Sequence, residues 1–226
     1  MNNENKLCWL YENCNHIDCE GFCLRKYKLN YLYESSLLPY NKRKYTPLYL
    51  DNDNSDKEAF TILKEFENDI ITFVENGSNL YIHSTICGNG KSSWAIRLLQ
   101  SYFNKIWIKS ELKCKALFIN VPQFLLALKE NISNKSDYVE HIKKNVYDTD
   151  LVIWDDIGNK SITQFEADNL LSIIDSRMSK QKSNIYTSNL NDEEIHQFLG
   201  DRLASRIVNS SYDIVLVGSD KRGLGK

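Results

Sequence analysis

The chain has 226 residues, of which 42% are hydrophobic and 12% aromatic, and its formal net charge at pH 7 is −2. This length suits one domain with a small appendage, and the hydrophobic share is enough for a core. There is no apolar run of the roughly 18 residues that a membrane span needs, and no signal-peptide core, so we expect a cytoplasmic protein with no membrane partner. The near-neutral charge does not by itself indicate a nucleic-acid partner.

Cysteines cluster at the start of the chain. In a protein expected to be cytoplasmic, a tight cluster favours metal binding over disulfides, and four thiolates can close a tetrahedral structural Zn²⁺ site. We therefore predict a Cys-rich zinc module over residues 1–35 that contacts a partner. Replacement of one thiolate by His16, or reduced cysteines without metal, are the alternatives. The predicted zinc ligands are Cys8, Cys14, Cys19 and Cys23.

The next segments lead from this module to a larger domain. Aromatic and basic residues alternate over residues 24–33, which predicts a helix that either packs its tyrosines on the module or binds a partner or nucleic acid. Residues 36–54 are typical of a connector. We place the main domain at residues 55–226. Its first 21 residues carry apolar side chains at steps of three and four, which predicts one helix to about Glu75, capped by Asn54 or Ser55.

A glycine-bearing loop follows a strand that we expect at residues 79–84, and a helix follows the loop. This order of strand, loop, Gly-Lys-Ser and helix is typical of a phosphate-binding loop. The glycines let backbone N–H groups turn towards phosphate, Lys91 would neutralise the β- and γ-phosphates, and Ser92 would bind Mg²⁺. Thr85 replaces the first glycine of the motif, and a simple hairpin turn is the alternative. The residues assigned to nucleotide binding here are Gly88, Asn89, Gly90, Lys91, Ser92 and Ser93.

Two carboxylates mark the third expected strand. Strands are predicted at residues 116–121 and 151–154, and the later one is fully apolar, as in the centre of a parallel sheet. Asp155 and Asp156 follow it, at the strand end where ligands bind in open α/β sheets. Asp155 would hold Mg²⁺ through water, and Asp156 would orient or deprotonate an attacking water. An acidic turn in solvent is the alternative.

An amide and two arginines complete the candidate site. A fourth strand is expected at residues 183–188, and Asn189 after it would hydrogen-bond a γ-phosphate or the attacking water, or else cap the next helix. Arg202 and Arg206 are four apart, so they share one helix face. An arginine presented to a γ-phosphate stabilises the charge of phosphoryl transfer, whereas a pair of surface salt bridges is the alternative.

Together with a fifth strand at residues 212–217, these motifs resemble the AAA+ ATPases. Within them the chain is similar to helicase loaders of the DnaC/DnaI type and to the related IstB transposition ATPases. The resemblance covers residues 36–226 and implies a three-layer α/β fold of the ASCE P-loop class, with a five-stranded parallel sheet and no C-terminal helical lid. The small size and Asn/Lys-rich composition are compatible with a phage or mobile element. The matching segments are Gly88–Ser92, Leu151–Gly158, Tyr186–Leu190 and Arg202–Ile207.

The resemblance also implies a function. It implies an ATPase, weak and stimulated by a partner or single-stranded DNA, that loads a DnaB-type replicative helicase onto single-stranded DNA at replication initiation. ATP and Mg²⁺ would be its cofactors, with Asn189 as sensor 1 and Arg222 in the manner of sensor 2. Arg206, favoured over Arg202, would be the arginine finger for a neighbour's ATP in a homo-oligomer. A transposition ATPase, or a nucleotide-switched binding module with negligible hydrolysis, is the alternative.

Overall fold

The protein is described from a computed structural model, over residues 10, 22–43, 46–50, 54–132 and 134–222. These residues form a five-stranded sheet in the order β2-β3-β4-β1-β5, in which every neighbouring pair of strands is parallel. The predicted parallel sheet is therefore confirmed, with strand ends within two residues of those expected. The strands are β1 (Asn79–His83), β2 (Ala116–Asn120), β3 (Leu151–Asp155), β4 (Ser183–Ser188) and β5 (Tyr212–Val215).

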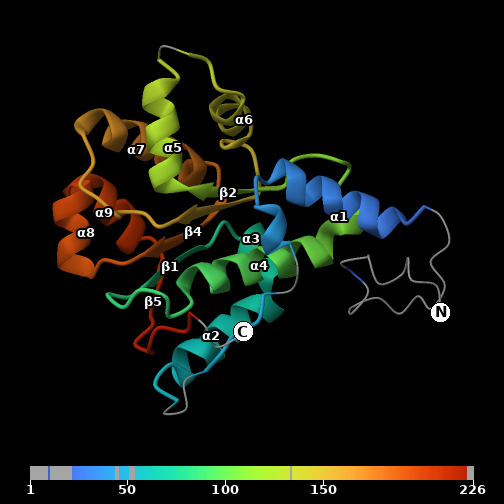
Figure 1. The fold of residues 1–226 in the computed structure, drawn as a ribbon, viewed down its shortest axis with the longest axis horizontal. Coiled ribbons are helices and arrows are strands. Elements are labelled where there is room, and N and C mark those ends of the chain that lie inside the picture. The colour runs from blue at the N-terminus through green and yellow to red at the C-terminus, as the bar shows by residue number, and fades with distance from the viewer. Residues whose placement is uncertain (1–9, 11–21, 44–45, 51–53, 133, 223–226) are drawn as a thin grey trace.

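Helices cover both faces of the sheet, which gives three layers (Figure 1). One face packs against α1 (Leu24–Ser35), α2 (Lys57–Asn68), α3 (Ile70–Glu75) and α4 (Lys91–Ile106). The other face carries α5 (Val121–Glu130), α6 (Asp137–Asn145), α7 (Gln164–Ser179), α8 (Asp192–Leu199) and α9 (Asp201–Val208). No helix among the described residues is long and apolar enough to cross a membrane.

Strand periodicity builds the two cores. Successive side chains of a strand point to opposite faces, so β1, β2, β3 and β4 each contribute to both hydrophobic clusters. In β1, Leu80 and Ile82 join the cluster under α1–α4, whereas Tyr81 joins the cluster under α5–α9. All five β1 residues are buried. This two-sided burial is why β2 and β3 are apolar over their first four residues.

The helix α1 packs on the main domain. Leu29, Leu32 and Tyr33 are buried, and the Tyr33 ring meets the Phe103 ring of α4 edge-on, with centroids 5.2 Å apart. Tyr27 stays 49% exposed. The predicted helix at residues 24–33 is therefore present, and its most buried tyrosine joins the core of the sheet domain.

One predicted helix is two. The expected single helix to Glu75 breaks at Asp69, whose φ of −106° and ψ of 25° are not helical, so α2 and α3 are separate. Side chains of α4 replace the missing helical donors there. The Ser101 hydroxyl donates to the Glu67 carbonyl at 3.1 Å, and the Lys105 ammonium also donates to that carbonyl, at 3.2 Å. Tertiary hydrogen bonds thus offset the break.

The cap of α2 also differs from the prediction. Its N-cap is Asp56 rather than Asn54 or Ser55, and the Asp56 side chain makes no hydrogen bond to the first turn. The carboxylate instead accepts hydrogen bonds from the backbone N–H groups of Val217 and Gly218, which follow β5. A tertiary contact rather than a local cap therefore fixes where α2 begins.

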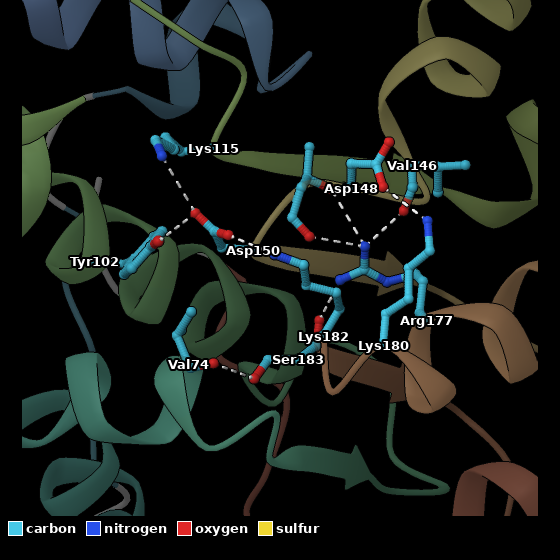
Figure 2. A network of polar contacts seen from close by, with 11 residues as sticks. Val74, Tyr102, Lys115, Val146, Asp148, Asp150, Arg177, Lys180, Lys182 and Ser183 are labelled. Atoms are coloured by element: carbon cyan, nitrogen blue, oxygen red, sulfur yellow. Dashed lines mark hydrogen bonds and ion pairs between the residues drawn. The ribbon is translucent and has the colours of Figure 1, made fainter. Parts of the chain in front are cut away.

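A buried arginine holds the amino-terminal edge of the sheet (Figure 2). Arg177 of α7 is fully buried and donates to the carbonyl oxygens of Val146 at 2.6 Å, Thr149 at 3.0 Å and Ser183 at 2.6 Å. Its Nε also donates to Asn184 Oδ1 at 2.8 Å. Burial lowers the pKa of Arg177 to about 10, so it stays charged near neutral pH. One side chain thus joins α7 and β4 to the segment between α6 and β3.

A carboxylate beside this arginine ties together further elements at the same edge. Asp150 accepts hydrogen bonds from Lys182 at 2.8 Å and from the Tyr102 hydroxyl at 3.3 Å, and it lies 3.7 Å from the Lys115 ammonium (Figure 2). These partners come from three different parts of the chain. Polar contacts therefore close the amino-terminal edge of the sheet, opposite the edge where the strands end.

We expect Arg177→Met to lower the free energy of unfolding by about 3 kcal/mol, because it leaves several buried carbonyl groups without a donor. The matched control is Lys180→Met, which removes the exposed pair with Asp148 in the same region and should cost less than about 1 kcal/mol. Urea denaturation followed by far-UV circular dichroism measures both. Equal losses for the two variants would contradict the role given to Arg177.

Candidate nucleotide-binding site

A cavity of about 340 Å³ opens at the carboxyl edge of the sheet. Its walls come from the loop between β1 and α4 and from the ends of β2, β3 and β4. Because β4 lies between β1 and β3, side chains from distant parts of the sequence meet there. The cavity is lined by Lys42, Gly88, Gly90, Lys91, Ser92, Ser93, Asn120, Asp155, Asp156, Thr187, Asn189 and Arg222.

The glycines give the loop between β1 and α4 its shape. Gly88 has a φ of 78° and Gly90 a φ of 112°, a region that side chains rarely adopt, and Gly90 is the N-cap of α4. Thr85 is not among the described residues with positive φ, so the loop does not need glycine there. The first N–H groups of α4 have no partner within the helix, and Ser92 and Ser93 on that turn line the cavity.

The loop lysine is drawn into the loop itself. The Lys91 ammonium donates to the Ile86 carbonyl at 2.8 Å, the Ser84 carbonyl at 3.3 Å and Asn89 Oδ1 at 3.2 Å. Burial lowers the pKa of Lys91. The Asn89 side chain is buried, lines an adjoining cavity rather than this one, and donates to Ser84 Oγ at 2.7 Å and the Leu216 carbonyl at 3.1 Å. Asn89 therefore shapes the loop, whereas the other predicted loop residues line the cavity.

One hydroxyl joins the Asp155 carboxylate to the backbone of Asp156. Thr187 Oγ1 donates to Asp155 Oδ1 at 2.8 Å and accepts from the Asp156 backbone N–H at 2.9 Å. Asp156 has a φ of 60°, a strained value that this bond helps to hold. Its carboxylate accepts from Asn189 Nδ2 at 2.9 Å and from Asn159 Nδ2 at 2.7 Å. The acidic pair is thus fixed in two separate orientations.

The surroundings of Asp156 also change its acidity. Burial, followed by the nearby negative charge of Asp155, raises the pKa of Asp156. Asn189 is free to contact Asp156 because another residue caps α8: Asn191 accepts from the Glu194 N–H at 2.9 Å in a capping box. The alternative in which Asn189 only caps that helix is therefore wrong.

Sequence reasoning missed Thr187 and Asn120. Their role depends on register: Asn120 pairs with Asp155 across β2 and β3, and Trp154 pairs with Tyr186, so Thr187 follows beside Asp155. In the sequence, the only sign of their role was a polar side chain, an amide or a hydroxyl, at the end of a predicted strand. Their neighbours are known only once the strand order is known.

A second cavity of about 290 Å³ adjoins the first and shares Lys42, Gly88, Gly90, Ser93 and Arg222 with it. Its other walls are mainly apolar and aromatic, and part of them comes from the segment predicted to be a connector. They include Thr46, Pro47, Leu48, Tyr49, Phe60 and Trp94. Residues 46–49 therefore do more than join two units.

The two arginines predicted as finger candidates, Arg202 and Arg206, line neither of these cavities. Arg202 and Arg206 are on α9, both are exposed, and neither lines the cavity of its own chain. Arg206 Nε pairs with Asp175 Oδ1 of α7 at 2.8 Å. Within a single chain Arg206 therefore forms a surface salt bridge, as the alternative prediction stated.

The predicted zinc site falls largely beyond the part that the structure describes. Cys8, Cys14, Cys19 and the alternative ligand His16 lie outside the described residues. Cys23 is the N-cap of α1, and its Sγ accepts from the Lys26 N–H at 3.4 Å. Among the described residues there is no group of three or more His, Cys, Asp or Glu side chains that could hold a metal. Zinc binding stays a prediction.

Residues 61–215 match the family described as IstB-like ATP binding protein. The chain belongs to this family. Its sequence is 24% identical over 154 residues to the replicative helicase loader DnaC of Escherichia coli K12, an alignment that covers 68% of this chain and 57% of DnaC. The chain thus matches a little over half the length of the curated loaders that it resembles.

Solved structures share the fold of this IstB-like protein. A putative primosome component from Streptococcus pyogenes serotype M3 superposes with a TM-score of 0.63 at 22% identity, covering 85% of this chain and 98% of that one. DnaI superposes with a TM-score of 0.62 at 18% identity, covering 82% and 95%. The predicted resemblance to DnaC and DnaI is confirmed, and the α/β fold is consistent with AAA+ proteins.

Proposed function

We propose that this protein is an ATP-dependent loader of a replicative ring helicase onto single-stranded DNA at replication initiation. The observation that carries the proposal is the cavity in which Lys91, both carboxylates and Asn189 meet at one sheet edge, in a member of an ATP-binding family. The sequence likeness to the helicase loader DnaC supports the choice of reaction. An IstB-type transposition ATPase is the second candidate, favoured by the family match itself.

The two adjoining cavities divide the nucleotide between them. The phosphates would lie on the glycine loop, where Lys91 exchanges its carbonyl partners for phosphate oxygens. The base and ribose would occupy the second cavity, where the rings of Phe60 and Trp94 offer apolar surface. Arg222 lines both cavities and therefore lies where base and phosphates join.

The donor set fits magnesium. Ser92 and Asp155 line the same cavity and offer a hydroxyl and a carboxylate, the hard oxygen ligands that Mg²⁺ prefers. Thr187 occupies Asp155 Oδ1, which leaves the other oxygen to act through water. A bound Mg²⁺ would neutralise charge on the β- and γ-phosphates.

Asp156 is the proposed catalytic base. Its carboxylate would orient and deprotonate the water that attacks the γ-phosphate, and Asn189 would hold that carboxylate and the water in line. Asn159 restrains the other oxygen at 2.7 Å.

Turnover by one subunit would be weak, because neither arginine of α9 reaches the cavity of its own chain. Arg206 would leave Asp175 and act as the finger for a neighbour's ATP in a homo-oligomer.

The N-terminal module would grip the helicase. Cys23 caps α1, and α1 packs on the ATPase domain, so a module folded around zinc at this point would be joined firmly to that domain. The proposed ligands remain Cys8, Cys14, Cys19 and Cys23, a closed set with a structural role.

The raised pKa of Asp156 predicts an unusual acid limb for ATP turnover. Asp156 acts as a base only when ionised, so kcat should fall as the pH drops through its pKa, which lies above the ordinary aspartate value of about 3.9. Steady-state turnover at saturating ATP from pH 4.5 to 8 measures this. Asp156→Asn should keep ATP affinity within about threefold and lose turnover at least 100-fold. A flat profile, or an active Asn variant, would remove Asp156 from this role.

Mixing two inactive variants tests the arginine finger. Lys91→Ala should weaken ATP binding at least 100-fold, whereas Arg206→Ala should bind ATP normally and lose turnover. If the finger acts between subunits, an equimolar mixture regains activity, because Arg206 of the first variant reaches ATP bound by the second. No recovery would place the finger elsewhere. Arg202→Ala is the matched variant, and recovery only with it would assign the finger to Arg202.

Native mass spectrometry with the replicative helicase of the same replicon tests the partner and the metal together. We expect a defined complex with ATP, carrying one zinc per chain, and loss of zinc when Cys14 and Cys19 are both changed to Ser. No complex under any nucleotide, together with ATP-dependent assembly on DNA, would favour the transposition ATPase. ATP binding with background turnover in the presence of helicase and single-stranded DNA would indicate a nucleotide-switched binding module.

A further inference from the structure

The segment after β5 crosses the loop between β1 and α4, residues 84–90, which we call the phosphate loop. We define residues 216–222 as the strap. The Leu216 N–H donates to the His83 carbonyl at 2.9 Å, and the Leu216 carbonyl accepts from Asn89 Nδ2 at 3.1 Å. Further along, the Lys221 N–H donates to the Gly88 carbonyl at 3.0 Å. The strap is therefore bonded to the phosphate loop at both of its ends.

The strap and the loop also pack closely. A Cβ atom at Gly88 would lie 2.0 Å from Asp220 Oδ1, so the Asp220 side chain of the strap packs directly against this glycine. The same carboxylate oxygen accepts the Arg222 N–H at 2.8 Å and turns the chain back. Lys221 and Arg222 line the second cavity, proposed for the base, and Arg222 also lines the first cavity, proposed for the phosphates.

One buried carboxylate anchors the strap from below. Asp56, the N-cap residue of α2, has a side chain with no exposed surface. Its Oδ1 accepts from the Val217 N–H at 2.7 Å and the Gly218 N–H at 3.0 Å, and its Oδ2 pairs with the Lys221 ammonium at 3.0 Å. The Lys221 side chain is only 7% exposed. Each buried charge therefore depends on the other, because an unpaired charge is strongly disfavoured there.

We infer that Asp56 is a positioning residue of the nucleotide site, which sets ATP affinity by holding the strap against the phosphate loop. The inference rests on the proposed ATP site. Asp56 touches neither cavity, so it acts through Lys221 and Arg222. Asp56 and the strap both lie outside the residues matched by the family, 61–215. The Asp156 carboxylate is held by Asn159 and Asn189 rather than by the strap, so we expect the rate of hydrolysis at saturating ATP to depend on Asp56 much less than ATP affinity does.

Asp56→Asn tests the inference with the smallest change of shape. Asparagine keeps an acceptor for the two backbone N–H groups but removes the negative charge that pairs with Lys221. We expect its Kd for ATP, from titration with a fluorescent ATP analogue and competition by ATP, to rise at least tenfold, while kcat at saturating ATP changes less than twofold. Lys221→Met should act in the same direction. The double variant should be no worse than the worse single variant, because the two changes remove one interaction.

Glu67→Gln is the matched control. Glu67 lies in the same helix and forms a mostly buried pair with Arg97 at 2.5 Å, but it lines neither cavity. It should lower thermal stability and leave the Kd for ATP within twofold. If Asp56→Asn and Lys221→Met bind ATP as well as Glu67→Gln does, the inference is wrong. The proposed function then still stands, provided that Lys91→Ala loses ATP.

The two failures are distinguishable. Wild-type protein that does not bind ATP overturns the proposed function and the inference together, whereas normal ATP binding by both strap variants overturns the inference alone. If Asp56→Asn does not fold, the double variant Asp56→Asn/Lys221→Met decides, since it leaves no unpaired buried charge and keeps an acceptor for the two backbone N–H groups. A fall in kcat without a change in Kd would also contradict positioning by Asp56.

Discussion

The parallel pairing of β4 with both β1 and β3 is the constraint on which the site depends. It brings the phosphate loop after β1, the carboxylates after β3 and the polar end of β4 to one sheet edge. Thr187 then joins Asp155 to the backbone of Asp156. Without this strand between them, the loop and the acidic pair would have no common support, and Asp156 would lose the bonds that hold its positive φ.

Polar groups at the two edges of the sheet have different roles. At the amino-terminal edge, Arg177 and Asp150 are saturated by carbonyl groups, lysines and a tyrosine, and these contacts connect helices to strands. At the carboxyl edge, polar groups hold one another but face a cavity. A rigid base beneath a polar opening suits a site that must keep its geometry while a ligand enters. Stability and binding are thus separated along the strand direction.

Long-range contacts also decide how the cavity is closed. The strap is held at the phosphate loop in part by Asp56. The Asp56 side chain does not cap α2 but accepts hydrogen bonds from the backbone N–H groups of Val217 and Gly218, which follow β5. The segment predicted to be a connector forms a wall of the second cavity. Both features place parts of the chain outside residues 61–215 against the proposed nucleotide, so affinity would depend on more than the family's matched core.

The sequence by itself determined the strands, the glycine-bearing loop after β1, the acidic pair after β3 and the family, because periodicity and short motifs are local properties of the chain. It also suggested Asn189, whose contact with Asp156 needs only two strand ends to be neighbours. Only the tertiary structure decided the break at Asp69, the bridging by Thr187, the inward turn of Asn89 and the anchoring by Asp56. Each depends on partners from distant parts of the sequence, and local propensity carries no record of such partners.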